Sequence, residues 1–141
     1  MESLPPFLTI VLGVTVLTVI GIVSGGTFLL KILGGKQGAN DLQKTFFRAG
    51  HAHAGVLVTL GLTIGLLTHV SGVGEVWAAV GTIAVLSAAI FMPAGFFLSV
   101  LGTDPQRPGK LIALLWVGAA ALTIGLAISG VGVIVAGIDR L

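Results

Sequence analysis

Long apolar runs, separated by short polar or glycine-rich links, divide the chain into four segments. The runs cover residues 7–33, 46–69, 76–101 and 110–138. Each run is longer than the roughly 20 residues that an α-helix needs to cross the hydrocarbon of a bilayer. A helix satisfies its own backbone hydrogen bonds in lipid, which offers no partners for them. We therefore expect a single domain over residues 1–141 with four transmembrane helices.

The links between the runs predict how the helices are connected. They read GGKQGANDLQK, HVSGVGE and GTDPQRPGK. Links of this length join helices that lie side by side and run in opposite directions. The fold class predicted is therefore an all-α membrane protein, with four transmembrane helices in an antiparallel bundle.

An internal repeat divides the four runs into two tandem helical hairpins. Residues 22–35 (IVSGGTFLLKILGG) align without gaps with residues 90–103 (IFMPAGFFLSVLGT), and LTIGL occurs in both the second and the fourth run. Parallel repeats of this kind are known in membrane proteins. On the spacing of LTIGL, His53 corresponds to Ala113, so the helical scaffold itself does not require a histidine there.

Composition supports a membrane location and excludes several functions. Apolar residues make up 55% of the chain and charged residues 9%, whereas a soluble domain has about 25% charged residues. The chain has no cysteine, which excludes disulfides, thiolate catalysis and metal clusters held by sulfur. No acidic residue falls inside the four runs, although a membrane carrier of protons or cations usually has one there. The net charge of +2 is too small to suggest nucleic acid as a partner.

Basic residues are concentrated beside two of the three links. Loops rich in Lys and Arg usually remain in the cytoplasm, so we expect the first and third links there and both termini outside. This is the topology of an integral protein of a bacterial cytoplasmic membrane. Only Arg140 lies on the other side, and the remaining cations are Lys31, Lys36, Lys44, Arg48, Arg107 and Lys110.

The start of the second run, FFRAGHAHAGVL at 46–57, carries the residues most able to do chemistry. Ionisable side chains in a membrane are costly, which makes His51 and His53 functional candidates, although both could also lie at the interface and bind water. Two positions on a helix correspond to about 200°, so the histidines cannot chelate one metal from the same face. Arg48 is either a snorkelling anchor or a partner for an anion such as a propionate or phosphate.

The third run adds aromatic residues at a comparable level. Phe91, Phe96 and Phe97 could form one wall of a site for a flat apolar ligand, or could simply pack. Small residues recur at helical spacing in the first two runs, as in Gly21 and Gly25 or Gly61 and Gly65. Such spacing permits close helix contacts and suggests an oligomer.

Two segments resemble a known family. HAHAGVLVTLG (51–61) resembles the second-helix segment of the small membrane styrene oxide isomerases and their hydroxylaminobenzene mutase relatives, and PAGFFLSVLGTDPQRPGK (93–110) is similar to their third helix and its exit loop. Together the segments cover about 30 of the 141 residues. The four-helix layout also agrees with this family.

The resemblance implies a trimer of four-helix bundles with a b-type haem at each subunit interface. Alignment of the His-x-Gly triplet places the axial iron ligand of the family at His53. In this family ferric iron acts as a Lewis acid that opens an epoxide to a carbonyl compound, a role in which a metal stabilises the developing alkoxide. The partners implied are further copies of the chain, the bilayer and a small apolar substrate.

The sequence departs from the family pattern at the positions thought to orient or assist substrate. Thr59 stands where the family has an asparagine, and Phe97 stands where it has a tyrosine, so these are the candidate catalytic positions. Thr59 keeps a hydroxyl group, whereas Phe97 keeps nothing polar. His51 replaces the arginine two residues before the ligand, where it could contact a propionate or compete as ligand, and Arg48 could supply the displaced positive charge.

Three hypotheses follow for the function. The first is a haem-b membrane isomerase that acts on an epoxide or a related small apolar substrate. The second is a haem protein without isomerase activity, serving redox chemistry, gas sensing or haem handling. The third is a non-haem accessory or scaffold subunit that associates through its small-residue faces. The departure at Phe97 weakens the first hypothesis relative to the second, and the occurrence of the histidines in only one repeat weakens the third.

Overall fold

The computed structural model describes residues 3–141, and all regular secondary structure in this part of the chain is helical. The four long helices are α1 (Pro6–Leu33), α2 (Asp41–Val70), α3 (Glu75–Leu98) and α4 (Ala113–Ile138), the last preceded by a 3₁₀ turn, η1 (Lys110–Ile112). All four are long and apolar enough to cross a membrane. The prediction of an all-helical chain with four membrane-length helices is therefore confirmed.

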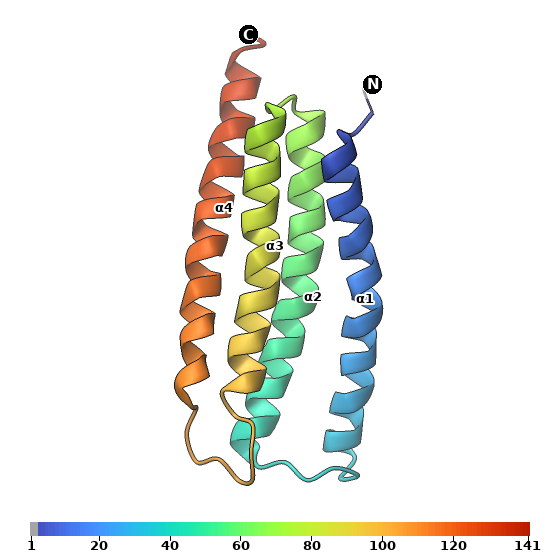
Figure 1. Cartoon of the computed structure of the whole chain (residues 1–141), viewed down its shortest axis with the longest axis vertical. Helices are drawn as coiled ribbons and strands as arrows, with labels where there is room; N and C mark the ends of the chain where they lie inside the picture. Colours follow the sequence, from blue (N-terminus) through green and yellow to red (C-terminus); the bar gives the residue numbers. More distant parts are fainter. Residues whose placement is uncertain (1–2) are drawn as a thin grey trace.

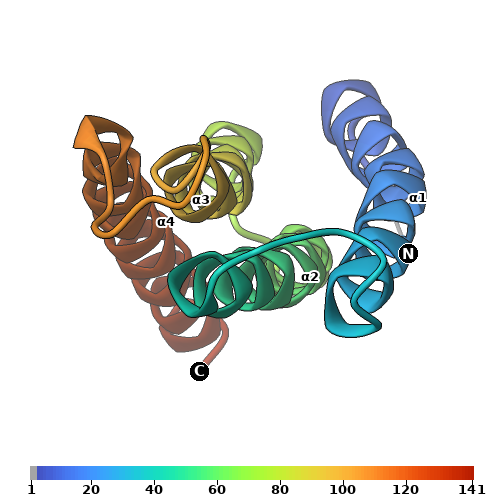
Figure 2. The same cartoon turned by 90° about the horizontal axis from the view of Figure 1, so that it is seen from below.

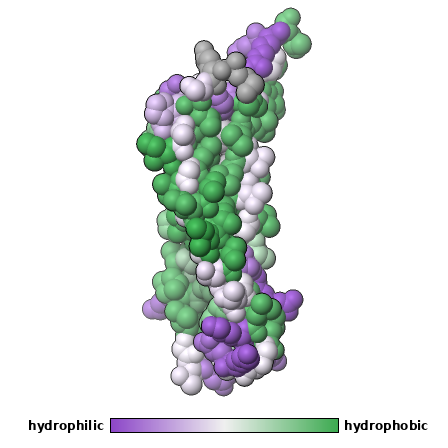
Figure 3. All heavy atoms as spheres, turned by 90° about the vertical axis from the view of Figure 1, so that its right-hand side faces the viewer, coloured by the Kyte–Doolittle hydropathy of each residue, from purple (hydrophilic) through white to green (hydrophobic). Residues whose placement is uncertain are grey.

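The surface of the molecule supports the same class of protein. Large apolar side chains such as Ile20, Val56 and Trp116 are more than half exposed. Figure 3 shows a broad hydrophobic band between two hydrophilic ends. Soluble monomers rarely expose apolar patches of such extent, so the length of the helices and the character of their surface indicate a membrane protein.

The two ends of the molecule differ in what they contain. The connections at 34–40 and 99–109 lie together at one end, and the connection at 71–74 lies at the other, beside both termini (Figure 1). The first of these is called the basic end below, because Lys36 and Arg107 lie in its connections and four further cations flank them.

The helices are not packed equally. α3 lies between α2 and α4 and contacts both along their lengths, whereas α1 has its main contacts with α2 alone. Seen from the basic end, α1 stands apart from α3 and α4 (Figure 2). The first hairpin is therefore more open than the second.

Contact between α3 and α4 depends on glycine. A Cβ atom at Gly95 would lie 2.6 Å from the backbone nitrogen of Leu115, and one at Gly125 would lie 2.9 Å from the carbonyl oxygen of Gly81. Only hydrogen fits at such distances, so the two backbones meet directly. This close contact is how small residues hold membrane helices together.

Two glycines of α2 allow close contact with neighbouring helices of the same chain. A Cβ at Gly61 would meet Leu86 of α3, and one at Gly65 would meet Leu12 of α1 and Thr82 of α3. These two glycines therefore bring α2 close to its neighbours, which is a role they can play without an oligomer.

The second helix begins at Asp41, ahead of the expected start at residue 46. A capping box is the reason: the Asn40 side chain accepts a hydrogen bond from the Gln43 backbone nitrogen at 2.9 Å, and the Gln43 side chain accepts one from the Asn40 nitrogen at 3.1 Å. This reciprocal pair satisfies amides that the first turn leaves free. The histidines therefore lie about three turns inside α2.

The third helix ends at Leu98, before the expected end at residue 101. Buried Gln43 of α2 stabilises this ending, because its amide nitrogen donates to the carbonyl oxygens of Val100 at 3.0 Å and Gly102 at 3.1 Å. Asn40 also donates to Asp104 and to the carbonyl of Pro105, both at 2.8 Å. The start of α2 and the loop after α3 are thereby held together at the basic end.

Candidate functional site

The candidate site lies in α2, where two phenylalanines precede two histidines. Phe46 and His53 are seven positions apart and share one face of the helix, whereas Phe47 and His51 are four apart and share another. The capping box at Asn40 sets the start of the helix and hence the direction of both faces. Each histidine is therefore accompanied by its own phenylalanine.

The His53 ring is held in one orientation by its surroundings. Its Nδ1 atom lies 2.8 Å from the carbonyl oxygen of Ala49, and its ring centroid lies 4.9 Å from that of Phe96 on α3. A carbonyl oxygen can only accept a hydrogen bond, so the network assigns the proton to Nδ1. In the neutral ring, Nε2 of this half-buried side chain then carries the lone pair.

Phe46 completes the surroundings of this ring. Its ring meets that of Phe96 edge to face, with centroids 5.7 Å apart and planes at 74°. Phe46, His53 and Phe96, called the His53 cluster below, thus form a small aromatic surface between α2 and α3. Sequence reasoning named Phe96 among a patch of three aromatics but missed Phe46, although its spacing of seven from His53 was a usable signal.

His51 faces α1 instead. A Cβ atom added to Gly25 would lie 3.4 Å from His51 Nδ1, and one added to Gly26 would lie 3.5 Å from Nε2. The half-buried ring therefore fills the space between α1 and α2 that these two glycines leave open. The two histidines therefore contact different helices, which agrees with the rotation of about 200° between them.

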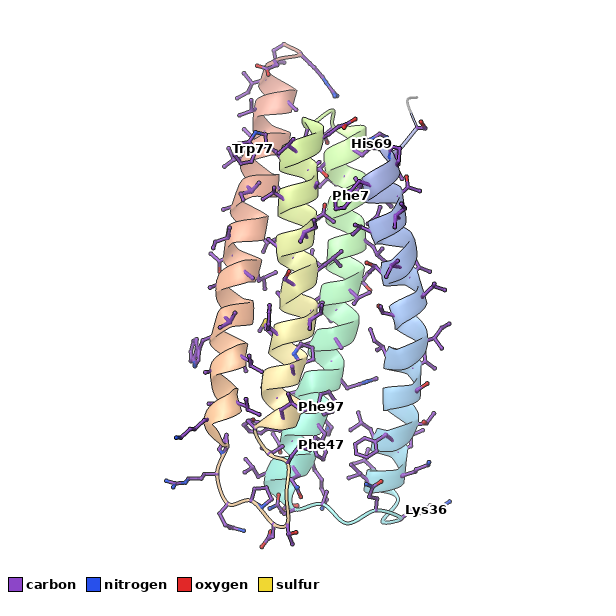
Figure 4. All side chains as sticks on the ribbon, viewed as in Figure 1. Phe7, Lys36, Phe47, His69, Trp77 and Phe97 are labelled. Carbon is purple, nitrogen blue, oxygen red and sulfur yellow. The ribbon has the colours of Figure 1, made fainter. Side chains whose placement is uncertain are left out.

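Phe97 lies on the side of His51 rather than that of His53. Its ring stacks on Phe47 with centroids 5.6 Å apart, and Phe47 in turn meets Phe28 of α1 at 5.7 Å. The ring also lies against Gly50, where a Cβ atom would come within 2.8 Å of it. Figure 4 shows Phe47 and Phe97 close together near the basic end. Phe97 is thus a packing residue of the core that includes Leu29, Ile32 and Val100.

Thr59 and Arg48 lie on the exposed face of α2. They are eleven positions apart, which is about 20° of rotation on a helix, whereas Thr59 and His53 differ by about 120°. The Thr59 hydroxyl donates to the carbonyl of Gly55 at 2.9 Å. Within one chain, Thr59 and Arg48 therefore lie on a different face of α2 from His53.

Arg48 has no carboxylate partner in the part of the chain that the structure describes. The only ion pair within residues 3–141 joins Lys44 and Asp41 at 3.1 Å, on the exposed first turn of α2. Arg48 keeps its guanidinium donors for an external anion or for lipid headgroups. Its exposed position near the basic end fits either interpretation.

A bare metal ion has no ready site in the described part of the chain. No group of three or more His, Cys, Asp or Glu side chains comes together there. Iron in a porphyrin has a smaller requirement, because the macrocycle supplies four nitrogens and the protein needs to add only an axial ligand. A single histidine such as His53 or His51, both half-buried in α2, offers a nitrogen of that kind.

Comparison of the chain with models of known protein families, with curated proteins and with solved structures gives no match. The fold and the site by themselves define a class of protein, namely an all-helical membrane protein with a half-buried histidine fixed between two of its helices.

Proposed function

We propose that this chain is an integral membrane protein that binds haem b through Nε2 of His53. The observation that carries the proposal is the hydrogen bond between His53 Nδ1 and the carbonyl oxygen of Ala49, at 2.8 Å. A histidine that ligates a metal usually donates its other ring N–H to a carbonyl or carboxylate, which fixes the tautomer and the ring orientation. His53 has this arrangement before any ligand is considered.

The surroundings of His53 suit a flat apolar group. Phe46 and Phe96 offer aromatic surface beside the ligand, and aromatic rings pack well against a planar macrocycle. Arg48 lies towards the basic end on another face of α2, with no carboxylate partner in the described residues, so it is available to a propionate of a haem held by a neighbouring copy. His51 is turned into the gap beside Gly25 and Gly26 and has no ligand role in the proposal.

When bound through His53, haem would supply ferric iron as a Lewis acid for the opening of an epoxide. The resemblance of residues 51–61 and 93–110 to styrene oxide isomerases makes the opening of an epoxide to a carbonyl compound the reaction to test. The role of the chain would be to hold the iron ligand in one orientation and to keep water away with the apolar side chains around it.

The positions that the resemblance assigns to substrate, Phe97 and Thr59, have less support than the position that it assigns to the iron ligand. Phe97 is packed against Phe47 and Gly50, and the Thr59 hydroxyl is bonded to its own helix. A haem protein without isomerase activity is therefore the second candidate, and this placement of Phe97 and Thr59 is the observation that favours it.

The proposal includes an assembly and an orientation. The four helices form an antiparallel bundle that assembles as a trimer, with the basic end in the cytoplasm. The exposed face of α2 that carries Arg48 and Thr59 supports this assembly, because a second copy there would bring both residues into a shared site. The open packing of α1 also leaves apolar surface that a neighbouring copy can cover.

Haem titration of the detergent-solubilised protein tests the proposal. We expect a Soret band after haemin is supplied, its loss in His53→Ala, and only a perturbed band in His51→Ala. Absence of the band would leave the non-haem scaffold hypothesis, and its loss in His51→Ala alone would contradict the ligand assignment. If the band is present, incubation with styrene oxide and an assay for phenylacetaldehyde separates an isomerase from a non-catalytic haem protein.

A further inference from the structure

The end of the molecule opposite the basic end contains a groove that the haem proposal does not use. Its volume is about 700 Å³, within the roughly 300–1,000 Å³ typical of small-molecule sites. One wall is the second half of α4, and the other is the connection at 72–74 with the first turn of α3. The apolar side chains that line it include Val73, Ile128, Val131 and Val135.

Two opposite charges lie in this groove. Asp139 and Arg140, directly after α4, both line it. Arg140 folds back so that one guanidinium nitrogen donates to the carbonyl of Ser71. Neither side chain forms an ion pair within residues 3–141, where the one such pair is at the far end of the molecule. Both charges are therefore available to a ligand.

The local backbone allows Arg140 to reach this position. A Cβ atom at Gly72, which has a φ of +72°, would lie 2.6 Å from Arg140 Nη2. Glycine at this turn therefore both adopts the left-handed backbone and leaves room for the guanidinium. Trp77 lines the same groove and lies near this end, on the α4 side of α3 (Figure 4), where its amphipathic ring suits a membrane interface.

We propose that this groove binds one phospholipid with a zwitterionic aminoethyl headgroup. An acyl chain would lie along the apolar wall of α4, the phosphate would meet Arg140, and the ammonium group would meet Asp139. A guanidinium pairs well with phosphate oxygens, and an ammonium group has three donors for a carboxylate. An anionic glycerol headgroup offers only the first contact, and the quaternary ammonium of a choline headgroup has no N–H to donate to Asp139, so the two side chains together select the aminoethyl headgroup.

Tryptophan fluorescence in the full chain can test this inference directly. The chain has two tryptophans, and Trp116 lies near the basic end, three residues into α4. A Trp116→Phe variant therefore reports from Trp77 alone. This variant is reconstituted into phosphatidylcholine nanodiscs, and brominated phosphatidylethanolamine or brominated phosphatidylglycerol is added at equal mole fraction to quench Trp77.

We expect phosphatidylethanolamine to quench Trp77 at lower mole fractions than phosphatidylglycerol, by up to about fivefold, the size of one exposed charge contact. Asp139→Asn should remove the difference between the lipids, and Arg140→Gln should weaken quenching by both. Glu75→Gln, which neutralises another carboxylate at this end outside the groove, should change neither.

Equal quenching by the two lipids in the parent variant would overturn the inference, as would a preference for phosphatidylglycerol. A preference that survives Asp139→Asn, or quenching that is unchanged in Arg140→Gln, would also overturn it. The matching Trp77→Phe protein, which retains Trp116, shows that each variant is inserted and folded, because quenching of Trp116 should depend on neither Asp139 nor Arg140.

Discussion

His51 and His53 are separated by one residue in α2, yet their rings contact different helices. The His51 ring lies over Gly25 and Gly26 of α1, and the His53 ring packs on Phe96 of α3 with centroids 4.9 Å apart. Two residues along a helix turn the side chain by about 200°, so this division follows from the geometry of α2. Only one histidine can therefore serve any one site, and each can be tested through its own neighbours.

Adjacent phenylalanines of α3 should have separable roles. Phe96→Leu removes the aromatic surface against His53, and we expect haem affinity to fall by roughly tenfold, the lower range for a residue that positions a metal ligand. Phe97→Leu removes the stack on Phe47 and should lower stability by about 1 kcal/mol while haem affinity stays nearly unchanged. Haemin titration and thermal melting of both variants measure the two effects.

The opposite result for these two variants would place the haem elsewhere. If Phe97→Leu weakened haem binding and Phe96→Leu did not, the haem would have to lie on the α1 side of α2, where His51 is. The His53 assignment would then be wrong.

The position of His51 can be tested by cross-linking, because the natural chain has no cysteine. A Gly25→Cys and His51→Cys double variant should be joined efficiently by a short bifunctional thiol reagent, since a Cβ at Gly25 lies 3.4 Å from the His51 ring. Val23→Cys with His51→Cys is the matched control, because Val23 is 64% exposed and lies on another face of α1. Mass spectrometry of the cleaved chain detects the link.

Equal yields from the two cysteine pairs would show that α1 rotates freely against α2. The arrangement of the first hairpin would then differ from the one described above.

The amino-acid sequence was sufficient for the helices and for the division between the histidines, but not for their neighbours. Apolar runs longer than a bilayer leave little alternative to helices, and the angle between His51 and His53 needs only the helical repeat. Which helix each ring meets depends on how α1 and α3 pack against α2. The loose packing of α1 has no signature in residues 7–33, which are as apolar as the tightly packed third run.

The same limit applies to Phe96 and Phe97. The resemblance selected Phe97 as a substrate position, whereas in this chain Phe96 meets His53 and Phe97 meets Phe47. A rotation of about 100° separates these neighbours on α3, and tertiary packing decides which of them faces the histidine. Gly50 contributes to this packing, because it lets α3 approach α2 at Phe97.

Replacement of Gly95 by alanine should strongly destabilise the second hairpin. The new Cβ would lie 2.6 Å from the Leu115 backbone nitrogen, so α3 and α4 would have to separate, at a cost of about 2 kcal/mol as for other overpacked contacts. Gly130→Ala is the control, because a Cβ there meets nothing within 4 Å, and alanine favours a helix over glycine. Unfolding titrations with SDS in mixed micelles compare the two, and a Gly95→Ala protein as stable as its parent would contradict the close contact of the backbones.

The attachment of the loop after α3 to the start of α2 should depend on the hydrogen bonds of Gln43. Gln43→Ala leaves the carbonyls of Val100 and Gly102 without the donor that now holds them, and a buried group left unpaired costs about 1–3 kcal/mol. We expect a lower melting temperature and faster proteolysis within residues 99–109. Gln106→Ala is a suitable control, because among residues 3–141 the Gln106 amide bonds only to the nearby carbonyl of Asp104 on the exposed surface. If cleavage were equally fast in both variants, the loop would be held by Asn40 and its bonds to Asp104 and Pro105 instead, and Asn40→Ala would then have to show the larger effect.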